Sequence, residues 1–363
     1  MSYLYNRLLR RSALLLSIAL VVAIPGTWGQ DQHFTQFYAA PLSFNPALTG
    51  AFNGNYRFGI IYRDQWRKAL DYPNVTYAAS ADLRFPMRIR GRDTGDAFGG
   101  GIIFFSDNYG ALGFSTNQVQ FSTAFHKALS QRSNQYLSLG LQGGFAQRNI
   151  NLENLTFDDQ FDGSTGFINP TGEQLPENNF TYGDLSVGLN YSFEPNRGTA
   201  VFAGLAFHHL FRPEMSFYAN DDSGRDFEDL ENSPLYMKFT SHLALLVPLS
   251  NTVQLLPRAL LYLQGPHLAL NAGANIRFPL GAFDNTALQV GGWLRPARDI
   301  NTSMQLESAI LMAGFEFRGI LLGLSYDANL RDISGSGNRR NALEISLSYF
   351  GNSEGDGILC PKF

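Results

Sequence analysis

The sequence predicts an all-β fold: a transmembrane antiparallel β-barrel of about fourteen strands with an N-terminal plug or lead-in segment. Three observations predict it. Several stretches alternate with a period of two, as in 184–191, where odd positions are apolar or aromatic and even positions are polar or glycine. The chain begins with a stretch typical of an export signal, and it is rich in glycine and aromatic residues but poor in charge. Together these features are typical of barrels in an outer membrane.

Residues 1–29 have the pattern of a cleaved signal peptide for Sec-type export. Arg7, Arg10 and Arg11 form a basic start, and an almost wholly apolar run follows from Ser12 to Ile24. That run is shorter than the roughly 20 residues that a membrane-spanning helix needs. The leucine-rich core favours general export over the twin-arginine route, and the absence of a nearby cysteine excludes lipid attachment at the cleavage site.

Composition excludes several classes of protein. Removing the first 29 residues leaves 24 basic and 31 acidic side chains and a net charge of −7, so we expect no nucleic-acid partner. Cys360 is the single cysteine, which rules out an internal disulfide and a cysteine-based zinc site. The mean hydropathy of −0.13 suits a barrel, because half of each strand faces the lumen.

The pattern along the chain divides the exported protein into three parts. Residues 30–54 have no strand periodicity and are expected to form a periplasmic or plug segment, 55–350 the barrel and 351–363 a periplasmic tail. An even number of strands, most of them long enough to cross a bilayer when tilted, is typical of such barrels. The expected strands are 55–66, 74–85, 97–108, 114–128, 134–149, 179–193, 199–210, 236–248, 253–264, 267–278, 286–295, 302–317, 320–330 and 341–350.

The alternation predicts which side chains face lipid and which face the lumen. In the run 343–349, leucine, isoleucine and tyrosine alternate with glutamate and serine, and 118–126 and 137–145 behave in the same way. An oily outside and a polar lumen are expected, because a midplane Lys or Arg costs about 2–4 kcal/mol on the lipid side. The first and last strands should pair, since unpaired edges are not tolerated in hydrocarbon. Trp66, Tyr109, Phe193 and Trp293 are expected in the interfacial aromatic girdles.

Two long polar interruptions, 150–178 and 211–235, follow the fifth and seventh expected strands. Barrels of this kind have short periplasmic turns and longer outward loops. We therefore expect both segments at the cell surface, with every odd-numbered strand ending there.

No stretch of the chain predicts a catalytic or cofactor site. The acidic stretches 158–162 and 220–231 invite a calcium-site interpretation, but the EF-hand spacing fails and solvated loops are favoured, with weak calcium binding left open. His208 and His209 would point to opposite faces of a strand, so they are not expected to chelate one metal. The chain has no G-x-S-x-G turn, and the glycines at 99–101 lack phosphate-loop spacing.

Specific motifs add to this periodicity. The opening Asp31–Pro41, the segment Asn45-Pro46-Ala47 and the strand motif Tyr62-Arg63-Asp64-Gln65-Trp66 closely resemble the PorP/SprF family of Bacteroidetes outer-membrane proteins. Further matches run through the exported chain: 106–110, 139–143, 208–210, 291–295, 323–327 and 360–363.

The resemblance implies a role in type IX secretion and, in some relatives, in gliding motility. The partners that it implies are type IX secretion components, periplasmic peptidoglycan-linked lipoproteins and the C-terminal domains of secreted cargo or adhesins, in addition to outer-membrane lipids. The expected function is therefore a non-enzymatic docking or anchoring partner that assists export or surface attachment of a secreted protein. A passive porin or solute transporter is the alternative with the same fold.

We expect a small set of residues to contact a partner or hold the plug, although ordinary filling of the lumen would explain each of them too. All of them lie in the family-like motifs described above: Phe37, Tyr38, Asn45, Pro46, Arg63, Gln65, Trp66 and Arg295. Tyr349-Phe350 and Phe363 are alternative terminal aromatics for barrel insertion, with Tyr349-Phe350 favoured.

Overall fold

We describe the protein from a computed structural model. The structure describes residues 31, 33–70, 72–89, 92–110, 113–131, 133–152, 155–164, 166–173, 175, 177–196, 198–217, 234–280, 286–298, 303–330 and 340–351. The expected signal peptide at 1–29, the acidic stretch at 220–231 and almost all of the tail at 351–363, including Cys360, lie outside these residues.

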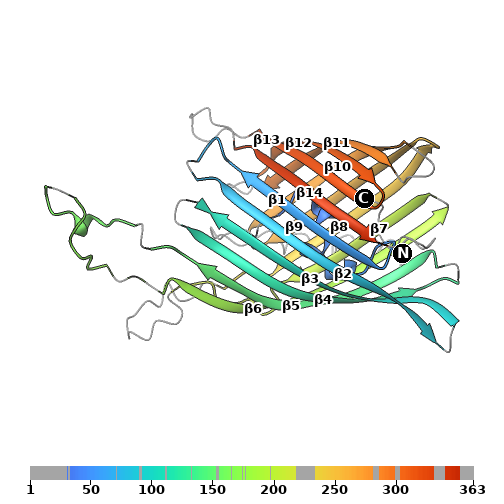
Figure 1. Cartoon of the computed structure of the whole chain (residues 1–363), viewed down its shortest axis with the longest axis horizontal. Helices are drawn as coiled ribbons and strands as arrows, with labels where there is room; N and C mark the ends of the chain where they lie inside the picture. Colours follow the sequence, from blue (N-terminus) through green and yellow to red (C-terminus); the bar gives the residue numbers. More distant parts are fainter. Residues whose placement is uncertain are drawn as a thin grey trace, which may run out of the picture.

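Fourteen antiparallel strands form a closed barrel in which each strand pairs with its neighbours along the chain (Figure 1). The strands are β1 (Tyr56–Gln65), β2 (Asn74–Ile89), β3 (Arg92–Tyr109), β4 (Phe114–Ala128), β5 (Gln135–Asn149), β6 (Asn179–Asn196), β7 (Thr199–His208), β8 (Lys238–Ser250), β9 (Val253–Gln264), β10 (His267–Pro279), β11 (Ala287–Arg298), β12 (Met304–Phe317), β13 (Ile320–Asn329) and β14 (Ala342–Gly351). β1 and β14 pair from Tyr56↔Gly351 to Gln65↔Ala342. The predicted barrel and its closure are confirmed.

The wall follows the predicted two-residue period. In β1, Phe58 and Ile60 are half exposed on the outside, whereas Arg57 and Arg63 are buried in the lumen. In β14, Leu343, Ile345 and Leu347 face outward and alternate with buried Glu344, Ser346 and Ser348. Because a polypeptide in lipid must satisfy its backbone groups internally, an apolar outer face on a closed ladder is the arrangement suited to a bilayer. Among the described residues, no helix is both long and apolar enough to cross a membrane.

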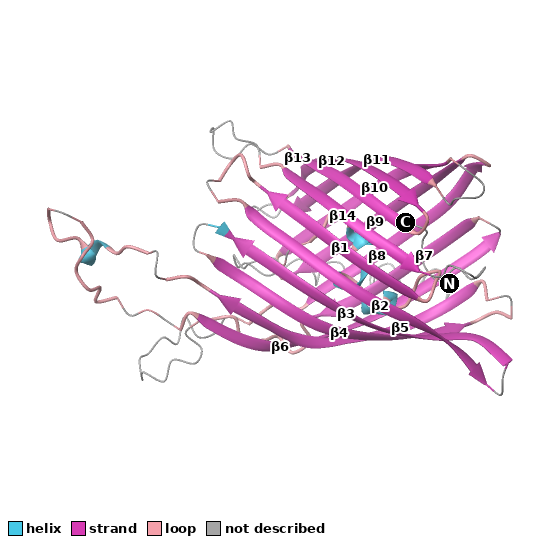
Figure 2. Ribbon diagram, in the orientation of Figure 1, coloured by secondary structure: helices cyan, strands magenta, loops and turns pink. Residues whose placement is uncertain are grey.

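Strand boundaries differ from the prediction mainly in one hairpin. β2 continues to Ile89 and β3 begins at Arg92, whereas the sequence predicted 74–85 and 97–108. Pro86 has no N–H for the ladder, and the register shifts between Pro86 and Arg88, so the pairing continues beyond an irregularity. This hairpin extends past its neighbours in Figure 2.

The connections differ in length at the two ends of the barrel. The longest connections, 150–178 between β5 and β6 and 209–237 between β7 and β8, both follow odd strands, although β9 and β10 are joined by only two residues. Loop 150–178 extends away from the barrel in Figure 1. Connections after even strands have at most seven residues, and the one between β12 and β13 has two. We call these ends the long-loop end and the short-turn end.

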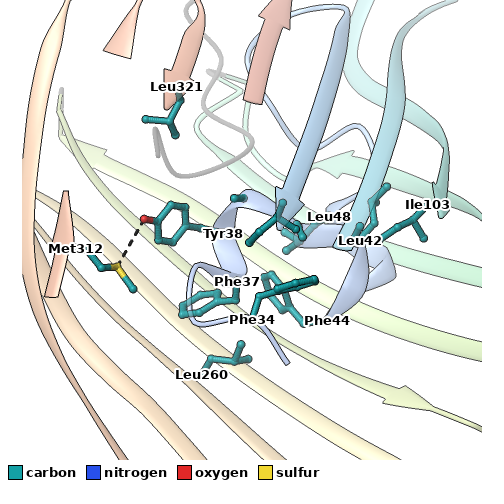
Figure 3. Packing of buried hydrophobic residues seen from close by; sticks show 14 of the residues in the cluster. Phe34, Phe37, Tyr38, Leu42, Phe44, Leu48, Ile103, Leu260, Met312 and Leu321 are labelled. Atoms are coloured by element: carbon teal, nitrogen blue, oxygen red, sulfur yellow. Dashed lines mark hydrogen bonds between the residues drawn. The ribbon is translucent and has the colours of Figure 1, made fainter. Parts of the chain in front are cut away.

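The lumen holds the described residues that precede β1. Three short 3-10 helices, η1 (Phe37–Ala39), η2 (Pro41–Ser43) and η3 (Pro46–Leu48), lie inside the barrel (Figure 2). We call residues 31 and 33–53 the luminal segment. Its side chains form the main hydrophobic core with Ile103, Leu260, Met312 and other wall residues (Figure 3). The expectation of a polar lumen throughout was therefore wrong at its centre, because the luminal segment covers apolar wall residues with its own.

Candidate functional site: the interface between the luminal segment and the barrel

The luminal segment runs from the long-loop end to the short-turn end. Asp31 contacts His209 and Lys238, where β7 ends and β8 begins. At the other end, the backbone N–H of Asn55 donates to the carbonyl of Gly351, the last residue of β14. The chain therefore crosses the lumen before it enters the wall as β1.

Local sequence explains why this crossing is made of turns. Pro41 and Pro46 each begin a 3-10 helix. The first N–H groups of a helix have no acceptor within it, so the N–H that proline lacks costs no hydrogen bond there. The Asn45 side chain accepts a hydrogen bond from the N–H of Ala47 at 2.9 Å and caps η3. Short turns keep the segment compact inside the barrel.

One wall of the barrel holds the segment through a buried charge network. The carboxylate of Glu344 on β14 accepts the backbone N–H groups of Thr35 and Gln36 at 2.7 and 2.8 Å and forms an ion pair with Arg63. The Thr35 hydroxyl donates to Asp327 at 2.6 Å and accepts a hydrogen bond from Arg63 at 3.1 Å. Arg295 also donates to the Thr35 hydroxyl and pairs with Asp327 at 2.9 Å. Two guanidinium groups and two carboxylates thus meet around one threonine.

The opposite wall grips the middle of the segment with neutral groups. The Asn45 amide donates to the carbonyls of Leu189 on β6 at 3.1 Å and Leu205 on β7 at 3.4 Å. The Phe44 carbonyl accepts from the Thr240 hydroxyl at 2.6 Å and lies 3.1 Å from Nε2 of His208. Strands on both sides of the lumen therefore hold the same short segment.

A third anchor lies near the short-turn end. Arg57 on β1 and Asp82 on β2 form a buried ion pair at 2.7 Å. Asp82 also accepts the backbone N–H of Gly50 at 2.7 Å, and Arg57 donates to the carbonyl of Leu48 at 3.1 Å. The pair thus binds one N–H and one carbonyl of the luminal segment.

The anchor at the long-loop end is a cluster of ionisable groups. Asp31 lies 2.6 Å from His209 Nε2 and 2.9 Å from Lys238 Nζ, and His209 Nδ1 lies 3.0 Å from Asp184. Burial lowers the pKa of His209, but the charge and hydrogen bonds of Asp31 and Asp184 outweigh it and raise that pKa to about 9. Burial raises the pKa of Asp31, but His209 and Lys238 hold it well below its usual range.

An aromatic cluster fills the space between the anchors. Phe37 packs edge-on against Phe44 and against Trp293 of β11, with ring centroids 5.4 and 5.7 Å apart. The Tyr38 hydroxyl donates to the Met312 sulfur at 3.6 Å (Figure 3). The Arg258 guanidinium lies 4.6 Å from the centre of the Tyr38 ring.

The structure places the eight residues singled out from the sequence at several positions. Phe37, Tyr38, Asn45 and Pro46 belong to the luminal segment and are buried, and Arg63 and Arg295 both contact Thr35. Gln65 accepts a hydrogen bond from Arg63 at 3.3 Å and so supports a residue that contacts the segment. Trp66 follows β1 in a left-handed backbone conformation, and the Arg340 guanidinium lies 4.8 Å from its ring.

Sequence reasoning missed the acidic half of the network. Glu344, Asp327 and Asp82 are each almost wholly buried. The sequence did contain a usable signal, since each of these carboxylates stands in the lumen-facing row of a strand. A carboxylate in such a position needs a buried partner.

Two further expectations were wrong. Trp293 does not lie in an interfacial girdle: it is buried in the lumen, where its indole N–H donates to Asn275 at 2.8 Å. His208 and His209 do not point to opposite faces, because β7 ends at His208 and His209 has a φ of 59°, so both rings are buried with centroids 6.3 Å apart. Within the described residues, no group of three or more His, Cys, Asp or Glu is arranged to hold a metal ion.

Comparison with known families shows to which family the chain belongs. A family model described as the type IX secretion system membrane protein PorP/SprF matches residues 27–349. The chain belongs to the PorP/SprF family. Membership makes it a membrane protein of type IX secretion that associates with components of that system, and its closed barrel is integral to the outer membrane. No curated protein matches this PorP/SprF chain.

Solved structures similar to this PorP/SprF protein are other barrels. A TodX monoaromatic hydrocarbon channel mutant is 12% identical, with 86% of this chain and 94% of that chain covered and a TM-score of 0.48. The toluene transporter TbuX of Ralstonia pickettii is 11% identical, with coverages of 86% and 92% and a TM-score of 0.46. A Pseudomonas aeruginosa FadL homologue is 11% identical, with coverages of 84% and 92% and a TM-score of 0.47.

Proposed function

We propose that this protein is a non-enzymatic docking and anchoring partner in type IX secretion. In this role the barrel fixes a complex in the outer membrane and assists export or surface attachment of a secreted protein. The secreted partner would contribute its C-terminal domain, and a peptidoglycan-linked lipoprotein would bind at the periplasmic face. Participation in gliding motility is part of the same proposal, because surface attachment of an adhesin would serve it.

The observation that carries the proposal is the way the lumen is filled. The luminal segment is held to β1, β13 and β14 by buried charges and to β6, β7 and β8 by hydrogen bonds. Breaking such a buried pair by removing one partner costs roughly 3–5 kcal/mol, so the segment is a poor gate for free diffusion. A rigid, filled barrel suits a scaffold better than a passive pore.

The loop between β5 and β6 supplies a surface for docking. At its tip Phe161 and Phe167 form an isolated bridge with rings 5.4 Å apart, and Ile168 is 72% exposed. Asp162 accepts the N–H groups of Ser164 and Gly166 at 2.8 and 3.0 Å, which orders the turn. An ordered apolar tip extending from the barrel is suited to contact a protein.

The test is deletion of the gene followed by an inventory of surface and secreted proteins, with affinity purification of the tagged protein from native membranes. We expect loss of one or a few surface proteins and recovery of secretion components. A variant with residues 151–178 replaced by a short linker should lose the secreted partner. Replacement of the β4–β5 turn, residues 129–134, is the control at the short-turn end. An unchanged surface inventory together with purification of the barrel alone would overturn the proposal.

Conductance in planar bilayers separates the proposal from the passive porin or solute transporter. We expect the intact protein to be silent and a variant lacking residues 33–52 to conduct. A large, steady conductance from the intact protein would favour the porin.

A further inference from the structure

A cavity of about 430 Å³ lies between the luminal segment and the wall formed by β3–β6, near the long-loop end. Phe34 and Ser43 of the luminal segment form one side, and residues of the four strands form the other. Its volume is in the range of small-ligand sites. Asp31 and Lys238 of the anchor at the long-loop end also line the cavity.

The floor of the cavity is apolar. Phe34, Ile103 and Phe105 line it, and the Phe34 and Phe105 rings pack edge-on with centroids 5.9 Å apart. Tyr109, Phe114 and Tyr182 continue this surface toward the long-loop end. An aliphatic or aromatic group of a ligand would be removed from water here.

Of the two described cations that line the cavity, Arg148 has no anionic partner among the described residues. Arg148 on β5 shares the lumen-facing row with Gln142 and Ala146 and lines the cavity. Its guanidinium lies 5.3 Å from the centre of the Phe114 ring, no carboxylate of the described residues forms an ion pair with it, and its buried Nε has no hydrogen-bond partner. A guanidinium held against an aromatic face in a lumen is suited to bind an anion.

The other charges at the cavity are already engaged. Lys238 pairs with Asp31 at 2.9 Å, and Asp107 accepts a hydrogen bond from the Thr76 hydroxyl at 2.7 Å. These two carboxylates repel a doubly charged anion more strongly than a singly charged one, and one carboxylate matches the one guanidinium at the cavity that has no ion-pair partner among the described residues. The side-chain amide of Gln118 and the Thr116 hydroxyl also line the cavity and supply neutral hydrogen-bonding groups for the rest of a ligand.

We propose that this cavity binds a carboxylate carried on an aromatic or aliphatic group, with Arg148 as the anion-binding residue. The ligand lays its apolar group on Phe34 and Phe105 and directs its carboxylate to Arg148. Two sources carry this chemistry: a free organic acid, and the C-terminal end of a polypeptide that enters from the long-loop end. The proposal does not depend on a docking role for the protein.

The test is isothermal titration of the full-length exported protein in detergent with two matched pairs of probes. N-acetylphenylalanine is compared with its amide, and a pentapeptide ending in phenylalanine is compared with its C-terminally amidated form. We expect each acid to bind at least tenfold more tightly than its amide. Binding of the small acid alone identifies a free organic acid as the source, whereas tighter binding of the pentapeptide acid identifies a chain terminus.

Variants locate the site. Arg148→Gln should weaken binding of the acid at least tenfold and leave the amide unchanged. Arg298→Gln is the control, because Arg298 is a partly buried arginine at the long-loop end of β11 that donates to the Pro266 carbonyl at 3.4 Å and does not line the cavity. Equal binding of acid and amide, or no binding of either, would overturn the proposal, and this comparison needs no variant to fold. Unchanged binding in a folded Arg148→Gln protein would also overturn it.

Discussion

The Glu344 carboxylate accepts the backbone N–H of Thr35 at 2.7 Å and so joins the last strand of the barrel to the first turn of the chain within it. Glu344 also stands directly opposite Arg63 in the β1–β14 ladder, where the two side chains form a buried ion pair. Closure of the barrel and retention of the luminal segment therefore share one residue. A change at Glu344 acts on both.

Glu344→Gln is expected to loosen the luminal segment. The amide removes the negative charge and leaves Arg63 with less compensation in the lumen, and breaking a buried pair in this way costs roughly 3–5 kcal/mol. The measurement is conductance in planar bilayers, together with the temperature at which the purified barrel unfolds. We expect intermittent channel openings that the parent protein lacks.

Glu316→Gln is the matched control for that change. Glu316 on β12 pairs with Arg277 on β10 and accepts a hydrogen bond from Gln289 on β11, so its polar contacts lie within the wall of the barrel. This variant should lose stability without gaining conductance. Openings of equal frequency in both variants would show that Glu344 has no special role in holding the segment.

Gly140→Ala should also weaken packing of the luminal segment, for a steric reason. A Cβ at Gly140 would lie 2.3 Å from the backbone N of Ala47, so η3 must move away from β5. Overpacking of this kind typically costs 1–3 kcal/mol. Gly100→Ala on the neighbouring part of the wall is the control, because its Cβ would meet no atom within 4 Å. Thermal unfolding of both variants measures the difference, and equal stabilities would contradict the role of Gly140 as a contact surface.

The strand pattern could be predicted because lipid imposes it. Every strand needs one apolar face, so the period of two in 343–349 and similar runs was enough to predict the strand count and the closure. Strand ends were less certain. Pro86 interrupts the hydrogen-bonding pattern without ending β2, because pairing with β3 continues beyond it. The sequence of β2 alone does not indicate this continuation.

The contents of the lumen were harder to predict, because alternation assigns a face but names no partner there. Trp293 was expected among interfacial aromatics, although it shares its row with Gln289 and Arg295, both of which face the lumen. That shared row was a usable signal. Arg63 and Glu344 could likewise have been paired once closure and register were considered together. The turns that place Thr35 between Arg63 and Arg295 follow no strand periodicity, so the full network required the structure.

The strength of the ionic contacts between Asp31 and its neighbours His209 and Lys238 is expected to depend on pH. The pKa of His209 is raised to about 9 by its carboxylate neighbours. The stabilisation that protonated His209 gives to the contact with Asp31 is therefore complete below a pH of about 6.5 and is lost as the pH rises through 9. The pKa of Asp31 is lowered, so its contribution is lost as pH falls below about 4. Hydrogen exchange at residues 33–36 should therefore be slowest between about pH 4 and 6.5, after correction for the intrinsic rate, and should accelerate near pH 9. In His209→Gln the acceleration near pH 9 should disappear. A parent profile that is flat between pH 6 and 10 would contradict this assignment.

The tip of the β5–β6 loop offers the sharpest test of docking. Ile168 is 72% exposed, so its side chain adds apolar surface to the loop tip and contributes little to the stability of the barrel. Ile168→Asn should leave the unfolding temperature within about 2 °C, since exposed substitutions usually change stability by less than about 0.5 kcal/mol. If the tip contacts the secreted protein, the same change should reduce its recovery in affinity purification several-fold, because a buried isoleucine at an interface contributes about 1.5–3 kcal/mol. Leu249→Asn provides the comparison: Leu249 is 60% exposed near the short-turn end of β8, where it should not meet a partner at the cell surface. Equal recovery with both variants would remove the loop tip from the docking surface while leaving the barrel and its filled lumen as described.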